Sequence, residues 1–146
     1  MVIARMETGF AVMGDSQHLP GYCLLLTNDP TANHLSDLAW PERREFLYEL
    51  AVLSAAVETA CRPRGLRRIN IEVLGNSLSV LHGHLHPRYE WEPAEMASGP
   101  VWRYPSEVRD DPANAYSAAR HGELRATITG ELGRLMEEAP GRIRES

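Results

Sequence analysis

Three of the six histidines in this 146-residue chain stand at alternate positions, in Leu81-His82-Gly83-His84-Leu85-His86. Successive side chains of a β-strand point to opposite faces of its sheet, so the three imidazoles are expected to project from one face. Imidazole can act as a metal ligand, as a nucleophile, or as an acid or base near neutral pH. The spacing therefore concentrates reactive groups in a single row.

Spacing alone leaves three interpretations of this row open. A His-x-His pair on a strand can supply two ligands to a metal ion, and His34 is a further candidate ligand. A neutral imidazole can instead attack phosphorus, and the resulting P–N bond is labile enough to be hydrolysed afterwards. The third interpretation is a solvent-facing histidine strand with no chemical role.

The elements that would position the row form an α+β set. Apolar runs and alternations predict strands over residues 8–13, 22–26, 68–74 and 78–86, and the last two are expected to pair as an antiparallel hairpin. Apolar residues at three- and four-residue spacing predict helices over 41–61 and about 118–138. We therefore expect one domain over residues 1–146, with a helical C-terminal extension at about 114–140.

Composition narrows the class of protein. Apolar residues make up 43% and charged residues 24% of the chain, as in globular rather than disordered proteins. The apolar runs are too short to span a bilayer, and the N-terminus lacks the apolar stretch of a signal peptide. Cys23 and Cys61 lie among apolar neighbours, which favours buried thiols in a reducing compartment. A cytoplasmic protein that is neither secreted nor membrane-bound is expected.

Charge argues against a nucleic-acid polymer as the partner. The net charge is −5, and the four arginines within residues 62–68 form the one basic cluster of note. The sequence contains no lysine, which excludes Schiff-base chemistry and a lysine-bearing phosphate loop.

Residues 69–89 resemble the signature of the histidine triad (HIT) superfamily. That signature, His-φ-His-φ-His-φ-φ with φ apolar, commonly follows a strand containing Asn and a Gly-x-Ser/Thr turn, and often precedes Pro-Arg. Asn70, Gly75-Asn76-Ser77 and Pro87-Arg88 stand at these places.

The resemblance extends beyond this segment, over a core of about residues 8–104. Residues 21–26 look like the first core strand of the family, and 34–38 look like its His-φ-x-x-φ before the main helix. Pro100-Val101-Trp102 is similar to a bacterial subgroup. The resemblance implies a HIT-like α+β fold with an antiparallel sheet of about five strands, a long central helix and a C-terminal helix.

Two registers of the motif are possible. Read literally, His84 is the central histidine, but Pro87-Arg88 then occupy the two apolar positions. Shifted back by two, His82 is central, His84 is third, and Ser77 lies five residues before His82, where the family has a phosphate-binding Ser or Thr. We adopt the shifted register. Val80 then replaces the first histidine, as in a bacterial branch resembling diadenosine tetraphosphate hydrolases.

The resemblance implies a nucleotide hydrolase or transferase that attacks the α-phosphate of a nucleotide conjugate, such as a dinucleoside polyphosphate or a nucleoside phosphoramidate. His82 would be the nucleophile that forms a nucleotidyl-histidine intermediate. His84 would hydrogen-bond the non-bridging phosphate oxygens, where negative charge develops.

The remaining roles implied by the resemblance concern binding of the substrate. Asn76 and Ser77 would donate hydrogen bonds to the phosphate, and Gly83 would allow close approach of the backbone. Asn70 would orient Ser77 or the phosphate, and His34 would lie near the phosphate or the ribose. The purine would need an apolar slot, for which the candidates are Phe10, Leu24 and Leu26.

Neither a metal nor another cofactor is required by this chemistry, although a polyphosphate substrate can bring Mg²⁺ with it. A homodimer is expected, because members of the family usually pair about a two-fold axis. The alternative is a HIT-like protein that binds a nucleotide without turning it over, and Val80 is the feature that keeps it open.

Residues outside the motif receive structural interpretations. His86 is expected at the rim or in solvent, and Arg88 beside an acid such as Glu90 or Glu92. Packing or dimer contacts are expected for Trp91 and Trp102, and surface positions for His18 and His121.

Overall fold

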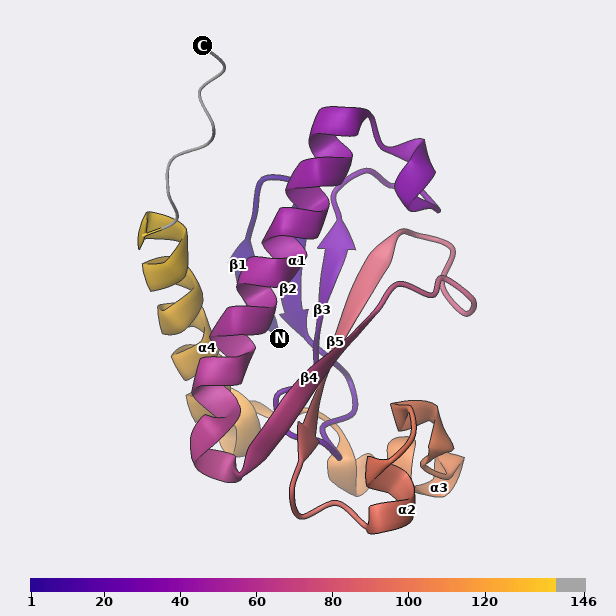
Figure 1. Ribbon diagram of the computed structural model, residues 1–146, viewed down its shortest axis with the longest axis vertical. Coiled ribbons are helices and arrows are strands. Elements are labelled where there is room, and N and C mark those ends of the chain that lie inside the picture. The colour runs from indigo at the N-terminus through magenta and orange to yellow at the C-terminus, as the bar shows by residue number, and fades with distance from the viewer. Residues whose placement is uncertain (139–146) are drawn as a thin grey trace.

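The computed structural model describes residues 1–138, and these form a five-stranded antiparallel sheet with helices (Figure 1). The order of the strands across the sheet is β1-β2-β3-β5-β4. Their bounds are β1 Val2–Arg5, β2 Gly9–Met13, β3 Cys23–Thr27, β4 Leu66–Glu72 and β5 His82–Tyr89. The long helices are α1 Trp40–Cys61 and α4 Ala118–Glu138, and the short ones are α2 Ala94–Ala97 and α3 Ser106–Arg109. The α+β fold expected from the sequence is confirmed, while residues 139 and 140 of the expected extension lie outside the described residues.

Helix α1 covers one face of the sheet, and α4 packs beside it against α1 and β1 (Figure 1). Pro41 lies in the first turn of α1, where a missing N–H costs nothing, and the carboxylate of Glu42 accepts a hydrogen bond from the Ala39 N–H at 3.2 Å. The buried side of α1 carries Phe46, Leu50, Leu53 and Val57. These side chains form the core with the sheet, and the free thiols of Cys23 and Cys61 are buried there, as expected.

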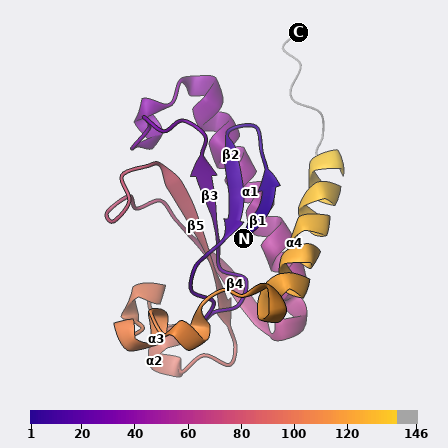
Figure 2. The same cartoon turned by 180° about the vertical axis from the view of Figure 1, so that it is seen from behind.

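Among residues 1–138, no long helix lies on the opposite face of the sheet. Figure 2 shows β2, β3 and β5 in front of α1, with α2 and α3 gathered at one end of the strands. The segment after β5 thus folds back over only part of this face. Within residues 1–138, no helix combines the length and apolarity needed to cross a membrane.

Strand β5 starts and ends later than expected. It was predicted over 78–86, but Leu78 is exposed in a loop and the strand runs from His82 to Tyr89. Pro87 does not stop it, because β3 pairs with β5 only as far as Leu85, whereas β4 still pairs at Pro87. A strand with one neighbour tolerates a residue that lacks an N–H. Strand β1 was not predicted, since four residues carry little periodicity.

Candidate functional site

The histidines of β5 share one face of the sheet, as the alternation predicts. The position of a side chain at Gly83 would fall 2.7 Å from the Leu50 side chain of α1, and Leu85 is fully buried on the same side. His82, His84 and His86 therefore point away from α1, toward the face seen in Figure 2, and are 5%, 8% and 3% exposed. The rings of Tyr22 and Trp102 lie against His84 and His86 and contribute to this burial.

Pairing across the sheet places apolar side chains beside two of these histidines. Leu26 lies opposite His82, and Leu24 opposite His84. Phe10 in turn lies opposite Leu26. Directly opposed residues of antiparallel strands share a face, so Phe10, Leu24 and Leu26, the expected slot for a base, lie on the histidine side.

His82 has its hydrogen placed by the main chain. Its Nδ1 lies 2.6 Å from the carbonyl oxygen of Val80. A carbonyl can only accept a hydrogen bond, so Nδ1 must carry the hydrogen. A neutral imidazole protonated at Nδ1 has its lone pair on Nε2, and the described residues offer no partner to that atom. His82 therefore has the form that a nucleophilic imidazole requires.

His84 contacts Tyr22, a residue that lies just before β3. The Tyr22 hydroxyl oxygen and His84 Nδ1 are 2.8 Å apart. Burial, and to a lesser extent the neighbouring His82, lowers the pKa of His84 to about 4. The imidazole of His84 is therefore neutral at pH 7, with one N–H to donate.

His86 is buried, so its expected place at the rim or in solvent is wrong. Its ring stacks on Tyr22 with centroids 4.4 Å apart, and neither of its nitrogens has a hydrogen-bond partner within the described chain. Glu72 is the nearest carboxylate, 3.9 Å from Nε2. Burial, followed by the neighbouring His84, His18 and Arg88, lowers the pKa of His86 to about 3.

Trp102 lies at the site, although the sequence suggested packing or dimer contacts for it. Its ring stands edge-on to His84 and His86, at centroid distances of 5.8 and 5.5 Å. The indole N–H donates to Glu72 at 2.8 Å, and the side chain is still 43% exposed. A half-exposed indole beside two histidines is placed to touch a ligand.

Three other residues were expected at packing or surface positions. Trp91 is 55% exposed and stacks on Tyr89. His18 and His121 are half-buried rather than fully at the surface.

Arg88 fastens the segment that carries Trp102 to the sheet. The guanidinium is 1% exposed and makes charge-assisted hydrogen bonds to both carboxylate oxygens of Glu92, one of the two expected partners. It also donates to the carbonyls of Met96 and Gly99 and to Asn70 Oδ1. All donors of a buried arginine are thereby satisfied, and residues 96–99 are held against β4 and β5.

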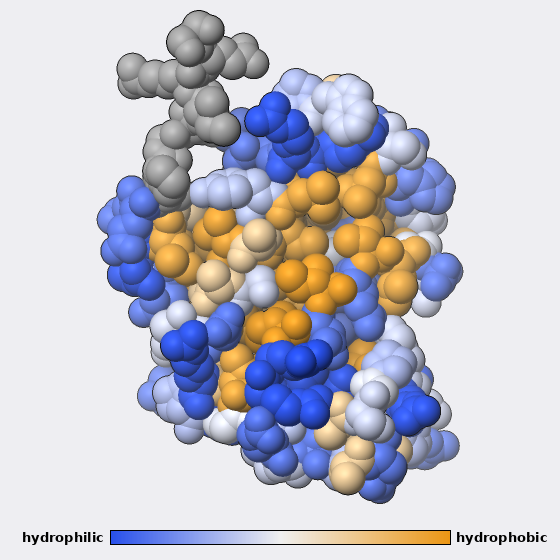
Figure 3. Space-filling model, in the orientation of Figure 1, coloured by the Kyte–Doolittle hydropathy of each residue, from blue (hydrophilic) through white to orange (hydrophobic). Residues whose placement is uncertain are grey.

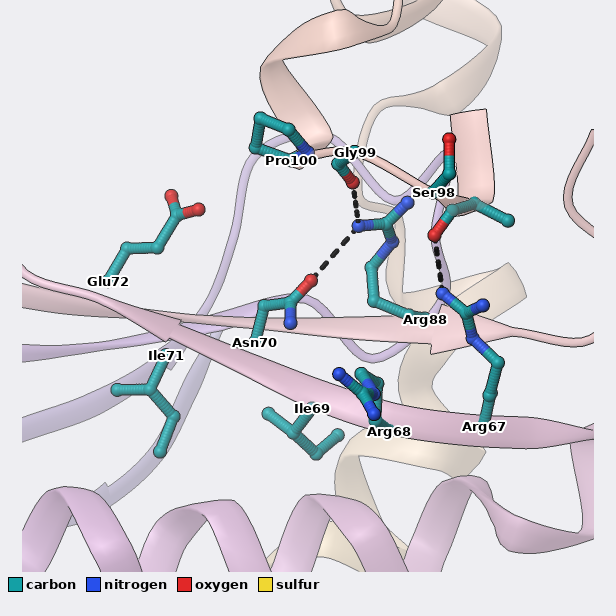
Figure 4. Close-up of a pocket in the computed structure, with 11 residues that line it drawn as sticks. Arg67, Arg68, Ile69, Asn70, Ile71, Glu72, Arg88, Ser98, Gly99 and Pro100 are labelled. Carbon is teal, nitrogen blue, oxygen red and sulfur yellow. Dashed lines mark hydrogen bonds between the residues drawn. The ribbon is translucent and has the colours of Figure 1, made fainter. Parts of the chain in front are cut away.

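Asn70 belongs to this arginine network. Its Oδ1 accepts from Arg88 at 3.0 Å (Figure 4). In the sheet Asn70 lies opposite His86. It was expected to orient Ser77 or the phosphate, but the structure gives it the arginine as its partner. A hollow of about 400 Å³ beside it is lined by β4, by Arg88 of β5 and by residues 97–100, and the three histidines are not part of its lining.

The loop between β4 and β5 carries Asn76 and Ser77, which are both exposed. This loop lies beside the segment before α1. The Leu81 N–H donates to the Ala32 carbonyl at 2.8 Å, and a side chain at Gly75 would come within 3.9 Å of the Asn33 carbonyl. His34, which follows directly, is exposed as well. The structure thus gathers the three residues near one end of β5, with their side chains free for a ligand.

The lack of a side chain at Gly83 is explained by close packing against α1, which the sequence did not reveal. It was expected to let the backbone approach the phosphate, but the side of Gly83 on which a side chain would stand faces Leu50 of α1. A metal ion, the other interpretation of the row, has no set of three His, Cys, Asp or Glu ligands in the part of the chain that is described.

Sequence reasoning missed Tyr22, Glu72 and Trp102 as members of the site. Residues two positions apart in a strand share a face. Tyr22 lies two positions before Leu24, which is on the histidine face, and Glu72 lies two positions after Asn70, which is opposite His86. This two-residue spacing is visible in the sequence, but only the pairing of the strands shows that Tyr22 and Glu72 lie beside the histidines.

Comparison with known proteins rests on structure. No family model and no curated protein sequence matches this chain. A histidine triad protein from Sinorhizobium meliloti 1021 superposes with a TM-score of 0.75 and 21% identity, over 90% of this chain and 88% of that one. A histidine triad protein from Marinobacter aquaeolei VT8 gives 0.74 and 21%, over 92% and 90%. A hypothetical histidine triad nucleotide-binding protein from Sulfolobus tokodaii strain 7 gives 0.69 and 14%, over 99% and 91%. The chain therefore has the fold of the histidine triad proteins, as its motif predicts.

Proposed function

We propose that the protein is a nucleotide hydrolase or transferase that attacks the α-phosphate of a nucleotide conjugate through His82. The observation that carries the proposal is the contact between His82 Nδ1 and the Val80 carbonyl, because it leaves the Nε2 lone pair available on the open face of the sheet. The histidine triad fold, and the nucleotide binding named for a protein with that fold, support the choice of a nucleotide.

The reaction has two displacements at phosphorus. The Nε2 lone pair of His82 forms a P–N bond while the bond from phosphorus to the bridging oxygen or nitrogen breaks, and the leaving group departs with that electron pair and takes up a proton. Water then attacks the same phosphorus, the P–N bond breaks, and the pair returns to Nε2 while the water loses a proton to solvent. His84 donates a hydrogen bond to the non-bridging oxygens in both steps.

The rest of the site would bind the substrate. His34, Asn76 and Ser77, which are exposed, would bind the phosphates or the ribose, and the side chains of Phe10, Leu24 and Leu26 would offer apolar contact to a base. The covalent steps require no metal, although Mg²⁺ can accompany a polyphosphate. Diadenosine polyphosphates and adenosine phosphoramidate are the substrate classes to test.

The alternative function is nucleotide binding without turnover. One observation favours it: Val80, which stands where the motif has its first histidine, brings no ionisable group to the site. A binding protein would keep the apolar slot and the phosphate contacts and would lose the chemistry.

The deciding experiment follows diadenosine tetraphosphate and adenosine phosphoramidate by chromatography with wild type, His82→Ala and His84→Ala. Turnover by wild type and a fall of roughly a thousandfold or more in His82→Ala support the proposal. Activity that survives in His82→Ala and disappears in His84→Ala would make His84 the nucleophile. Absence of turnover by wild type, with nucleotide bound in a calorimeter, would select the alternative.

We further propose a homodimer that uses the free edge of β4 and the neighbouring side of α1. Ile71 and Val73 are 47% and 38% exposed, Leu47 of α1 is 44% exposed, and Ile71 points toward α1 (Figure 4). Figure 3 shows an apolar area on the face that α1 and β4 present. An unpaired strand edge beside apolar surface favours pairing with a second copy. Light scattering should give a dimer for wild type and a monomer for Ile71→Glu, with Val2→Glu on the other sheet edge as the control.

A further inference from the structure

Tyr22 makes two contacts that fix its ring in the site. Its ring lies nearly parallel to that of His86, with an interplanar angle of 10° and centroids 4.4 Å apart. Its hydroxyl oxygen lies 2.8 Å from His84 Nδ1. The stacking holds the ring, and the ring brings the hydroxyl to one nitrogen of His84. No role in the proposed reaction has been given to Tyr22 so far.

The direction of this hydrogen bond follows from what else each group can bind. If His84 Nδ1 carried the hydrogen and donated it, the half-buried Tyr22 hydroxyl would have to donate elsewhere, and the described residues give it no other acceptor. If Tyr22 donates to a bare Nδ1, both groups are satisfied by one bond. The hydrogen of a neutral His84 must then be on Nε2.

We propose that Tyr22 is a positioning residue that holds His84 in the tautomer with its hydrogen on Nε2, where it faces the phosphate. His82 is held in the opposite tautomer, since the Val80 carbonyl takes its Nδ1 hydrogen. The two rings lie edge-to-face with centroids 4.7 Å apart. One imidazole therefore presents a lone pair and its neighbour an N–H, which is the pairing that attack on a phosphate with charged non-bridging oxygens needs.

Neighbouring side chains do not compete for this role. His86 stacks on the same tyrosine, but neither of its nitrogens has a partner in the described chain. Trp102 meets His84 edge-on through its ring and directs its N–H to Glu72. The Tyr22 hydroxyl is thus the group that distinguishes the two nitrogens of His84.

The tautomer can be measured without any turnover. Long-range ¹H–¹⁵N correlation spectra at neutral pH report which ring nitrogen is protonated, because protonated and bare nitrogens resonate far apart. Wild type should show His84 protonated at Nε2 and His82 at Nδ1, and Tyr22→Phe should give His84 a mixture of both tautomers. Tyr48→Phe, on the exposed side of α1, is the control and should match wild type.

Two outcomes of this measurement would overturn the proposal: wild-type His84 protonated at Nδ1, or a Tyr22→Phe spectrum identical to that of wild type. The consequence for catalysis rests on the proposed function. Tyr22→Phe should lower kcat by about tenfold with KM nearly unchanged, while Tyr48→Phe keeps both. A rise in KM at constant kcat would make Tyr22 a binding residue and also contradict the proposal. Since the spectra need no substrate, they test the tautomer of His84 even if the protein does not hydrolyse nucleotides.

Discussion

The Nδ1 of His82 lies 2.6 Å from the carbonyl oxygen of Val80, two residues before it in the chain. In the register with His82 central, Val80 stands where the motif has its first histidine. The contact that orients His82 comes from the main chain, and any residue at position 80 can make it. The departure from the motif therefore leaves the hydrogen on Nδ1 and the lone pair on Nε2.

This relationship predicts that turnover depends on the side chain at position 82 but hardly on the side chain at position 80. Val80→Ala should keep turnover within about threefold of wild type, because it retains the carbonyl. His82→Asn should abolish turnover and the nucleotidyl adduct while nucleotide affinity remains, since the nucleophile alone is lost. Initial rates measure turnover, intact-protein mass after quenching detects the nucleotidyl adduct, and calorimetry measures nucleotide affinity. An adduct on His82→Asn would contradict this prediction.

The buried histidines predict how stability depends on pH. Burial puts the folded-state pKa of His84 at about 4 and of His86 at about 3, below the ordinary 6.5. As the pH falls through 6.5, the unfolded chain therefore takes up protons that the folded chain does not, and stability declines until the folded-state values are reached. The charged and titratable groups that face His86 are Tyr22, Glu72, His84, His18 and Arg88.

His86→Phe should weaken this dependence, because it removes a buried imidazole with a lowered pKa and keeps a ring to stack on Tyr22. It also removes two buried nitrogens that have no hydrogen-bond partner among the described residues, so stability above pH 7 should be equal or higher. Thermal melting of wild type and His86→Phe between about pH 7.5 and about pH 5 measures the effect. Parallel curves for the two proteins would show that His86 is not the group responsible.

The buried Arg88–Glu92 pair should contribute far more to the free energy of unfolding than an ion pair at the surface does. Arg88 and Glu92 side chains are 1% and 0% exposed, and Glu92→Gln leaves a buried guanidinium without its counter-charge. We expect a loss of about 3 kcal/mol in the free energy of unfolding. Glu58→Gln breaks the exposed pair with Arg62 and should cost less than about 0.5 kcal/mol. Urea denaturation measures both, and equal losses would argue against a structural role for the buried pair.

Gly83 should not tolerate a side chain. A Cβ there would lie 2.7 and 2.9 Å from the two methyl carbons of Leu50, so Gly83→Ala has to displace Leu50 or α1. The expected cost is about 1–3 kcal/mol in the free energy of unfolding. Gly122 in α4 has open space around it, and Gly122→Ala should instead stabilise by up to about 1 kcal/mol. A neutral Gly83→Ala would mean that α1 shifts freely over the sheet.

Much of the sheet could be predicted from the sequence because strand periodicity is local. Alternation at period two is enough to put His82, His84 and His86 on one face, and Pro41 with its apolar repeat is enough to start α1 within a residue of where it begins. The apolar run predicted the strand at 22–26, which the structure has at Cys23–Thr27. The start of β5 was missed because Leu78 continues the apolar pattern in a loop.

What the sequence determined by itself was the row of imidazoles, the two long helices and the histidine triad motif, whereas α2 and α3 were not predicted. Only the tertiary structure decided which residues surround that row. Glu72 reaches His84 and His86 through the pairing of β4 with β5, and Tyr22 reaches them because β3, which it precedes, pairs with β5 from far along the chain. Trp102 reaches them because Arg88 and Glu92 hold the segment after β5 against the sheet. Side-chain periodicity is set by the backbone of a few neighbouring residues, whereas burial and hydrogen-bond partners depend on contacts between segments that no local pattern encodes.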